Sequence, residues 1–222
     1  MMDATVVYYT SNHEDPAFES AILWQLIEAS KGLPLITVSQ KPLDFERNIC
    51  VGDHGVSNVN IFRQMLIGIE AAFTAYVITA EADFLHPEEY FQFRSPDPNV
   101  MYAGMPLYIL SAQRGKRRTF CAKERGSEGA MIVDRELLVG YLKQMLKGQP
   151  EWIDSPGRDT VRLPFLFNMG PMEVFQLKTP LVSFRTAHQL HRATPWKVGS
   201  EVRELPGWGN AADLIVKYMG KL

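Results

Sequence analysis

YVITAEADFLHPEEYF, residues 76–91, joins a strand-like run to a pair of carboxylates. β-Branched and small apolar residues dominate 75–80, which predicts a buried strand. Glu81 and Asp83 follow it directly, and side chains two residues apart on an extended chain point the same way. Like charges this close repel unless something positive lies between them. A hard divalent ion, Mg²⁺ or Mn²⁺, is a natural partner because it binds carboxylates and phosphates; the alternative is an ordinary solvated turn.

The segments before this stretch alternate between strand and helix. Their periodicity predicts strands and helices, in turn, at 4–10, 16–30, 33–39, 58–73 and 75–80. Asp15 followed by Pro16 fits a helix cap with proline at the first helical position, and Ser57 or Asn58 can cap the second helix. The long polar stretch 40–57 is predicted to be a loop. This order is typical of an α/β, Rossmann-like, mostly parallel sheet flanked by helices, which binds ligands at the carboxyl ends of its strands.

The pattern changes after Pro98. Shorter strand-like runs and further helices are predicted at 99–104, 107–112, 118–122, 135–146, 173–184 and 210–219. The runs just after Pro98 are short and closely spaced, which favours a small mixed or antiparallel part. The chain shows no internal repeat, low-complexity tract or clear linker, so residues 1–222 are predicted to form one domain.

Composition narrows the class of protein. Of 222 residues, 46% are hydrophobic, which suits a globular domain. No apolar run approaches the ~18 residues that would indicate a membrane span, and the N-terminus lacks the features of a signal peptide. Cys50 and Cys121 make neither a disulfide framework nor a zinc site. A cytoplasmic location is therefore expected. An oligomeric state does not follow from the sequence.

The charge is distributed unevenly along the chain. Residues 1–100 hold 5 Lys and Arg against 14 Asp and Glu, a balance of −9. Residues 101–222 hold 18 against 11, a balance of +7. This asymmetry suggests an acidic or metal-binding first half and an anion-facing second half. The alternative is a chance distribution of solvated surface charge.

Several of these segments together resemble the GT-A glycosyltransferases. Besides the strand–helix order, 81–87 (EADFLHP) is similar to their acidic motif, and 126–142 (GSEGAMIVDRELLVGYL) to the turn and strand that lead into an acceptor-side helix. The segments 151–159 (EWIDSPGRD) and 174–184 (VFQLKTPLVSF) resemble their late acidic segment and closing strand. Glu81 stands where Asp is more common in the family.

The resemblance implies a GT-A-like fold and a metal-dependent transferase that uses a nucleotide-diphosphate sugar, with a UDP-sugar favoured. Residues 1–98 would form the nucleotide-sugar-binding half and 99–222 the acceptor-side half. The residues implied in donor binding are Thr10, Ser11, Asn12, Glu14, Asn58, Arg63, Gln64, Ala82 and Arg192. Small polar side chains at a strand-to-helix turn also suit a nucleotide by themselves, although an ordinary capping turn has the same composition. Arg63 would contact a phosphate or pair with Glu70.

The implied metal ligands are Glu81 and Asp83, with a late histidine as the third. TAHQLHRATPW contains His188 and His191, and His191 is favoured because the residues after it look like a loop able to close over the donor. Imidazole suits Mn²⁺ better than Mg²⁺. Arg192 nearby would balance the leaving diphosphate. The alternative for each histidine is a surface or packed residue.

An inverting transfer needs a carboxylate that removes the proton of the acceptor hydroxyl. Asp154 is the first candidate, Glu151 the second and Glu128 the third, and each has a surface acid as its alternative. Glu128 is also a candidate for acceptor binding. The sequence leaves inverting and retaining chemistry open.

The segment considered for acceptor binding is 114–125, RGKRRTFCAKER, which contains six Lys and Arg and one Glu. Basic residues around an aromatic suit a phosphate backbone. The acceptor-binding candidates are Arg114, Lys116, Arg117 and Arg118. An enzyme of this kind could glycosylate a flipped-out hydroxymethylated base in DNA, as some phage enzymes do, and would then act in the host cytoplasm. A solvated hairpin face is the alternative, with saccharide, lipid-linked or protein acceptors.

Two other classes of protein stay open. A sugar-nucleotidyltransferase would need a Gly-rich, basic phosphate loop, whereas SNHEDP, residues 11–16, is acidic. A non-catalytic carbohydrate- or nucleic-acid-binding module would tolerate the loss of Glu81 and Asp83.

Overall fold

The computed structural model describes residues 3–94, 97–112, 118–154, 163–186 and 200–220. Its first half contains β1 (Ala4–Thr10), α1 (Pro16–Ser30), β2 (Leu35–Ser39), β3 (Asn48–Cys50), α2 (Asn58–Glu70), β4 (Tyr76–Glu81), β5 (Phe84–Leu85) and η1 (Glu88–Gln92). Its second half contains β6 (Met101–Ser111), β7 (Phe120–Lys123), β8 (Met131–Asp134), α3 (Arg135–Met145), η2 (Leu166–Asn168), β9 (Met172–Arg185), β10 (Glu201–Val202), β11 (Glu204–Leu205), β12 (Gly209–Asn210) and α4 (Ala211–Met219).

The predicted caps of the first two helices are present. The Asp15 carboxylate accepts from the backbone N–H groups of residues 17 and 18, at 2.9 and 3.1 Å, and Pro16 opens α1. The Ser57 hydroxyl accepts from the Asn60 N–H at 2.9 Å and caps α2. These bonds satisfy backbone donors that the first turn of a helix leaves without intrahelical partners.

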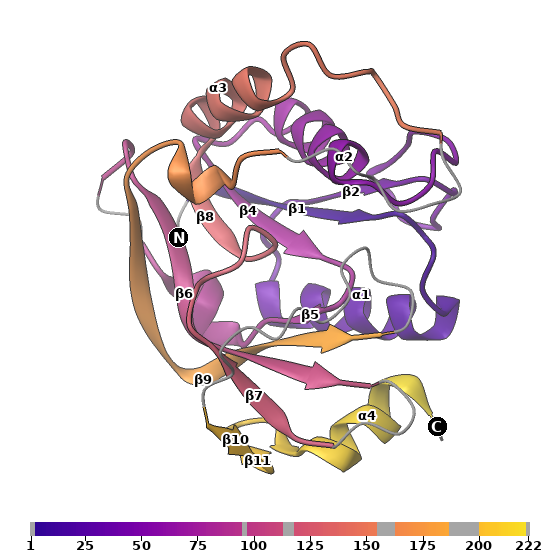
Figure 1. The fold of residues 1–222 in the computed structure, drawn as a ribbon, viewed down its shortest axis with the longest axis vertical. Helices are drawn as coiled ribbons and strands as arrows, with labels where there is room; N and C mark the ends of the chain where they lie inside the picture. The colour runs from indigo at the N-terminus through magenta and orange to yellow at the C-terminus, as the bar shows by residue number, and fades with distance from the viewer. Residues whose placement is uncertain (1–2, 95–96, 113–117, 155–162, 187–199, 221–222) are drawn as a thin grey trace.

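One sheet of ten strands runs through the described chain, in the order β10–β7–β6–β8–β4–β1–β2–β3, with β9 beside β6 and β5. β4, β1, β2 and β3 are parallel neighbours, and β6 pairs parallel with β9. β8 joins the two parts by pairing antiparallel with both β4 and β6. The predicted α/β class is confirmed, with a parallel first part and a mixed second part (Figure 1).

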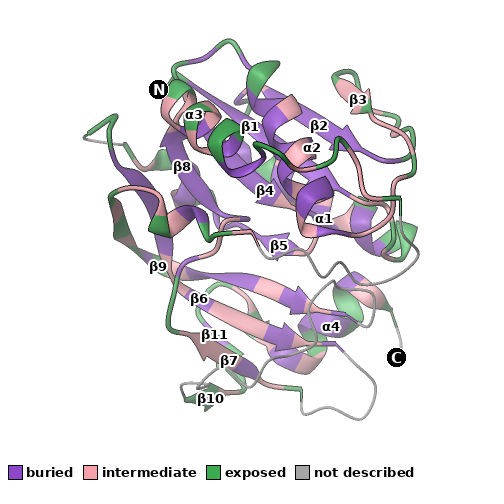
Figure 2. Ribbon diagram, turned by 45° about the horizontal axis from the view of Figure 1, so that its top comes forward, coloured by how far each residue is buried: buried purple, intermediate pink, exposed green. Residues whose placement is uncertain are grey.

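The helices cover both faces of this sheet. α2 and α3 pack together on one face, and α1 lies with α4 on the other (Figure 1). Each helix pair closes a separate apolar core against the sheet. β1 and β2 are buried along their whole length, as Figure 2 shows, because helices cover them on both sides. No helix in the described ranges is long and apolar enough to cross a membrane.

Two predictions of secondary structure were wrong in detail. The segment 40–57 is not entirely a loop, since Asn48–Cys50 forms β3 and pairs parallel with β2. The short runs at 99–104 and 107–112 are one strand, β6, whose register against β9 shifts between Met105 and Leu107. Pro106 lies within this shift, where a residue without an N–H is tolerated.

Candidate active site

The carboxyl ends of β1, β2 and β4 lie side by side at one edge of the sheet. In the register of these strands, Thr10 lies opposite Ser39, and Tyr9 lies opposite Glu81. The turn after β1, the segment after β2 and the carboxylates after β4 therefore converge. Open α/β sheets bind ligands in the crevice beyond this edge.

Glu81 and Asp83 act on the same tyrosine. The Tyr9 hydroxyl donates to Glu81 Oε1 at 3.3 Å. Burial raises the pKa of Tyr9 well above its usual value, and the charges of Glu81 and Asp83 raise it further. The Asp83 carbonyl accepts from the Phe184 N–H at 2.8 Å, which holds this segment against β9. The two carboxylates thus form one electrostatic group with Tyr9.

Glu128 joins this group from the second half of the chain. Its carbonyl accepts from the Thr79 hydroxyl at 2.8 Å and from the Tyr9 hydroxyl at 3.5 Å. Its carboxylate accepts from the Leu166 N–H at 2.6 Å. The next residue, Gly129, lies so close to Glu81 that a Cβ there would meet its Cδ at 2.5 Å. A larger residue here would force the Glu81 carboxylate or the turn to move.

Two basic residues lie among these acids. Lys123 ends β7 and Arg185 ends β9. Burial lowers the pKa of Lys123, and the charges of Glu81, Asp83 and Glu128 oppose that shift. Burial raises the pKa of Glu81, while Lys123 and Arg185 lower it. We call Glu81, Asp83, Lys123, Glu128 and Arg185 the charged cluster. It combines three acids with two bases, so the protein supplies part of the positive charge that the paired carboxylates require.

The pKa of Glu128 suits proton transfer near neutral pH. It is raised to about 7, mainly by burial and to a smaller extent by the charge of Glu81. The Leu166 N–H and Lys123 offset part of this rise. A general base functions best when its pKa lies near the working pH. The pKa of Glu128 therefore fits this role.

The turn after β1 is braced by its own side chains. The Thr10 hydroxyl donates to the buried carboxylate of Glu19 at 2.9 Å, and the Asn12 amide donates to the same carboxylate at 3.2 Å. Asn12 has a left-handed backbone (φ 55°), and its Oδ1 accepts from the N–H groups of residues 40 and 41, both at 2.9 Å. Ser11 is partly exposed, and Glu14 accepts from the Thr186 hydroxyl. Thr10 and Asn12 thus have structural bonds at this edge.

The polar residues of α2 also serve the scaffold. Gln64 donates to the carbonyls of Thr10 and Val38, at 2.7 and 3.2 Å, and so ties α2 to β1 and β2. Arg63 donates to the carbonyls of residues 149 and 150. It does not pair with Glu70, whose partner is Lys143. Asn58, the first residue of α2, is partly exposed, and Ala82 is buried.

Asp154 lies on the α2 side of the edge, beside His54. Asp154 Oδ1 lies 2.7 Å from His54 Nδ1, and the His54 ring stacks on Trp152 with centroids 4.3 Å apart. Asn60 holds this segment by bonds to both the N–H and the carbonyl of Ile153. The Asp154 side chain is 71% exposed, and Glu151 is exposed as well. The described partner of the Asp154 carboxylate is thus His54, outside the charged cluster.

The remaining predicted site residues are only partly described. Arg114, Lys116, Arg117, His188, His191 and Arg192 lie outside the described residues. Within the basic run, Arg118 and Arg125 are exposed, whereas Lys123 is partly buried among the acids. The described part of the run is therefore not a uniform basic face.

The donor set at the edge can be tested against a metal. Among the described residues, no group of three or more His, Cys, Asp or Glu is arranged to hold a metal ion. Mg²⁺, however, is usually held by one or two carboxylates together with substrate phosphates. Glu81 and Asp83 provide two such carboxylates, so the residues present fit that form of binding.

Comparisons with known proteins add matches among solved structures alone. No protein-family model matches the sequence, and no curated protein matches it. One solved structure found by the comparison is described as a glycosyltransferase involved in the glycosylation of the major capsid of PBCV-1. Its TM-score is 0.46 at 13% identity, over 81% of this chain and 92% of that chain. At this level of similarity the match carries no argument about activity, ligands or site residues.

Proposed function

We propose that the protein transfers a sugar from a nucleotide-diphosphate sugar, with a UDP-sugar favoured, to an acceptor hydroxyl. One observation supports this most: Glu81, Asp83 and Glu128 lie with Lys123 at the carboxyl edge of a parallel sheet. Such edges bind nucleotides, and the leaving group of this reaction is an anionic diphosphate. Cations beside the carboxylates would bind the phosphates of the donor and would also keep the acids ionised.

A divalent metal, Mn²⁺ or Mg²⁺, would be held by Glu81 and Asp83 together with phosphate oxygens of the donor. When bound, it would stabilise the charge that develops on the departing diphosphate. Lys123 and Arg185 would add fixed positive charge for the same leaving group. His191 or His188 stays the proposed third ligand.

Glu128 is the proposed proton acceptor if the transfer inverts the sugar carbon. Its pKa of about 7 lets it accept a proton from the acceptor hydroxyl at neutral pH. We place it ahead of Asp154 because Asp154 is mostly exposed and bonds to His54. Tyr9, whose hydroxyl lies beside Glu81 and the Glu128 carbonyl, would position the carboxylates.

For the acceptor, a saccharide hydroxyl is favoured over a hydroxymethylated base in DNA. Lys123 belongs to the basic run 114–125 but interacts with the acids of the charged cluster. That leaves Arg118 and Arg125 as the exposed bases in the described part of the run, separated by an exposed acid, Glu124. DNA stays the second candidate and is tested alongside saccharides.

Thermal-shift titration tests the donor site directly, because a ligand that binds only the native state raises the melting temperature. The full chain is titrated with UDP, ADP, GDP and CDP, each with Mn²⁺ or with EDTA. The expected result is a shift with UDP that requires the metal. The double variant Glu81→Ala/Asp83→Ala is expected to lose it.

Turnover is then measured as UDP release from UDP-sugars, with neutral oligosaccharides and hydroxymethylated DNA as acceptors. Absence of a shift with every diphosphate would contradict the proposal. A shift unchanged in the double variant would contradict the metal site. Pyrophosphate release from a nucleoside triphosphate and a sugar phosphate would instead indicate a sugar-nucleotidyltransferase.

A further inference from the structure

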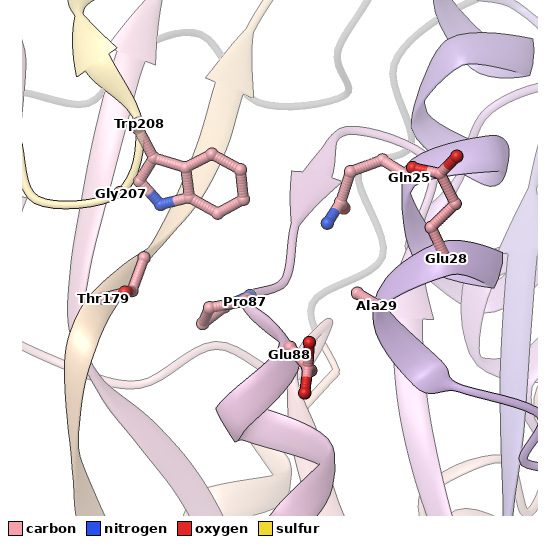
Figure 3. Close-up of a pocket in the computed structure, with 8 residues that line it drawn as sticks. All are labelled: Gln25, Glu28, Ala29, Pro87, Glu88, Thr179, Gly207 and Trp208. Carbon is pink, nitrogen blue, oxygen red and sulfur yellow. The ribbon is translucent and has the colours of Figure 1, made fainter.

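A pocket of about 340 Å³ lies on the face of the sheet that α1 covers, and it shares no lining residue with the charged cluster. Segments far apart in the sequence build it: α1, the start of η1, the middle of β9, and the turn between β11 and β12. Figure 3 shows the Trp208 indole reaching into this space, with Gln25 across from it. The volume falls in the lower part of the range of small-molecule sites, ~300–1,000 Å³.

Trp208 is fixed in place. Its Nε1 donates to the Pro180 carbonyl at 2.6 Å, and its backbone N–H bonds to the Leu205 carbonyl at 3.2 Å. Gly207 has a left-handed backbone (φ 76°), and a Cβ there would meet Thr179 Cγ2 at 2.6 Å. The turn can therefore lie directly on β9, which presents the indole as a flat, preorganised apolar surface. Preorganisation lowers the entropic cost of binding.

The side of the pocket across from the indole is polar. Gln25 Nε2 donates to the His86 carbonyl at 2.7 Å, and Gln25 Oε1 accepts from the His86 N–H at 3.3 Å, so the amide is held rigidly. Glu28 lines the same side from the next turn of α1. Glu88 also lines the pocket and forms an ion pair with Lys31. The pocket thus offers hydrogen-bond donors and acceptors around one aromatic surface.

We propose that this pocket binds a neutral sugar ring, stacked on Trp208 by its C–H face and hydrogen-bonded through its hydroxyls to Gln25 and Glu28. A pyranose has this division into a flat apolar face and a polar rim. An organic cation would also suit an indole with carboxylates, but Lys31 already neutralises Glu88, which leaves less negative charge for it. The inference goes beyond the proposed transferase activity, because binding here requires neither donor nor turnover.

The test is saturation-transfer NMR and calorimetry on the full chain with cellobiose, lactose and maltose, and with choline as the cationic comparison. At least one disaccharide is expected to bind at millimolar concentration. Trp208→Ala is expected to weaken binding roughly tenfold or more. Trp24→Ala is the matched control, because it removes the same type of side chain from α1 at a position that is 64% exposed and does not line the pocket.

Glu28→Ala provides an independent variant if Trp208→Ala disturbs the turn. Glu28 is exposed on α1, so its replacement should preserve the fold while weakening disaccharide binding several-fold. Absence of binding by all three disaccharides would overturn the inference. So would disaccharide binding that Glu28→Ala leaves unchanged, or saturable binding of choline alone. Nucleotide binding at the charged cluster is scored separately, so failure of either proposal is recognisable without the other.

Discussion

The two parts of the sheet contribute opposite charges to one edge. The parallel part ends in Glu81 and Asp83, whereas the mixed part supplies Lys123 and Arg185 from the ends of β7 and β9. The charge is −9 in the first 100 residues and +7 in the rest, and at this edge acids of the first part lie near bases of the second. Charge segregated along a chain can be complementary after folding, when topology brings strand ends together.

Glu128 breaks this division, because it is an acid supplied by the mixed part, and its replacement should have the largest effect. Glu128→Gln keeps the size of the side chain but cannot accept a proton. We expect kcat to fall by roughly 10²–10⁴-fold. In the wild type, the rate should rise with pH through about 7 as Glu128 loses its proton, and this rise should be lost in the variant.

Asp154→Asn is the paired variant for that experiment, measured by initial rates from pH 5.5 to 8.5. If Asp154→Asn abolishes the reaction and Glu128→Gln does not, Asp154 is the base.

The stability of the Glu128→Gln variant offers a second readout. The pKa of Glu128 is about 7 in the folded chain and lower in the unfolded chain, so the wild type loses stability as pH rises between these two values. The stability of Glu128→Gln relative to the wild type should therefore be higher at pH 8 than at pH 5.

Lys123→Met tests whether the bases of the mixed part compensate the acids of the parallel part. Removing this cation leaves partly buried carboxylates without its charge, and we expect a loss of about 2–3 kcal/mol in the free energy of unfolding at pH 8. Urea denaturation measures the loss. Adding Glu81→Gln should recover part of it, because the two charges are coupled. Simple additivity of the two variants would contradict the compensation.

Gly129→Ala tests how closely the two parts approach. Its Cβ would lie 2.5 Å from Glu81 Cδ, so the carboxylate or the turn must move. We expect a loss of about 1–2 kcal/mol in unfolding free energy, as for other overpacked sites. Gly140→Ala is the control, since a Cβ at that position in α3 meets nothing within 4 Å. It should be neutral or stabilise by up to ~1 kcal/mol, as alanine favours helices.

His86 contrasts with the charged cluster because it is fully buried among aromatic rings. Burial lowers its pKa to about 3, although the Gly129 backbone lies near enough to offset part of that shift. The unfolded chain therefore binds a proton between about pH 6.5 and 3 that the folded chain does not. Stability should fall with falling pH in this range, by at most ~1.4 kcal/mol per pH unit.

His86→Phe removes this titration while keeping an aromatic ring at the position. Its unfolding free energy, measured by urea denaturation between pH 4 and 7, should depend less on pH than that of the wild type. The slope is compared rather than the absolute stability, because the larger ring changes the packing. Equal slopes would show that acid sensitivity comes from other groups.

Local sequence patterns were sufficient for most of the fold. The strands at β1, β2 and β4 read as apolar runs because helices cover both faces, and Asp15 and Ser57 marked the helix starts. The mixed part was harder to predict. The strand predicted at 173–184 matches β9 closely, but its buried and exposed residues alternate irregularly, so its pairing does not follow from a local pattern. β3 is only three residues long and was missed for that reason.

The sequence by itself determined the α/β class, the caps, and the delivery of Glu81 and Asp83 to a strand end, because these depend on periodicity and on neighbours in the chain. Only the tertiary structure decided that Lys123 and Glu128 interact with those acids and where the Trp208 pocket lies. It also decided that Gln64 donates to backbone carbonyls of β1 and β2. Such contacts join residues from distant strands. They depend on strand order and register, which no short stretch of the sequence determines by itself.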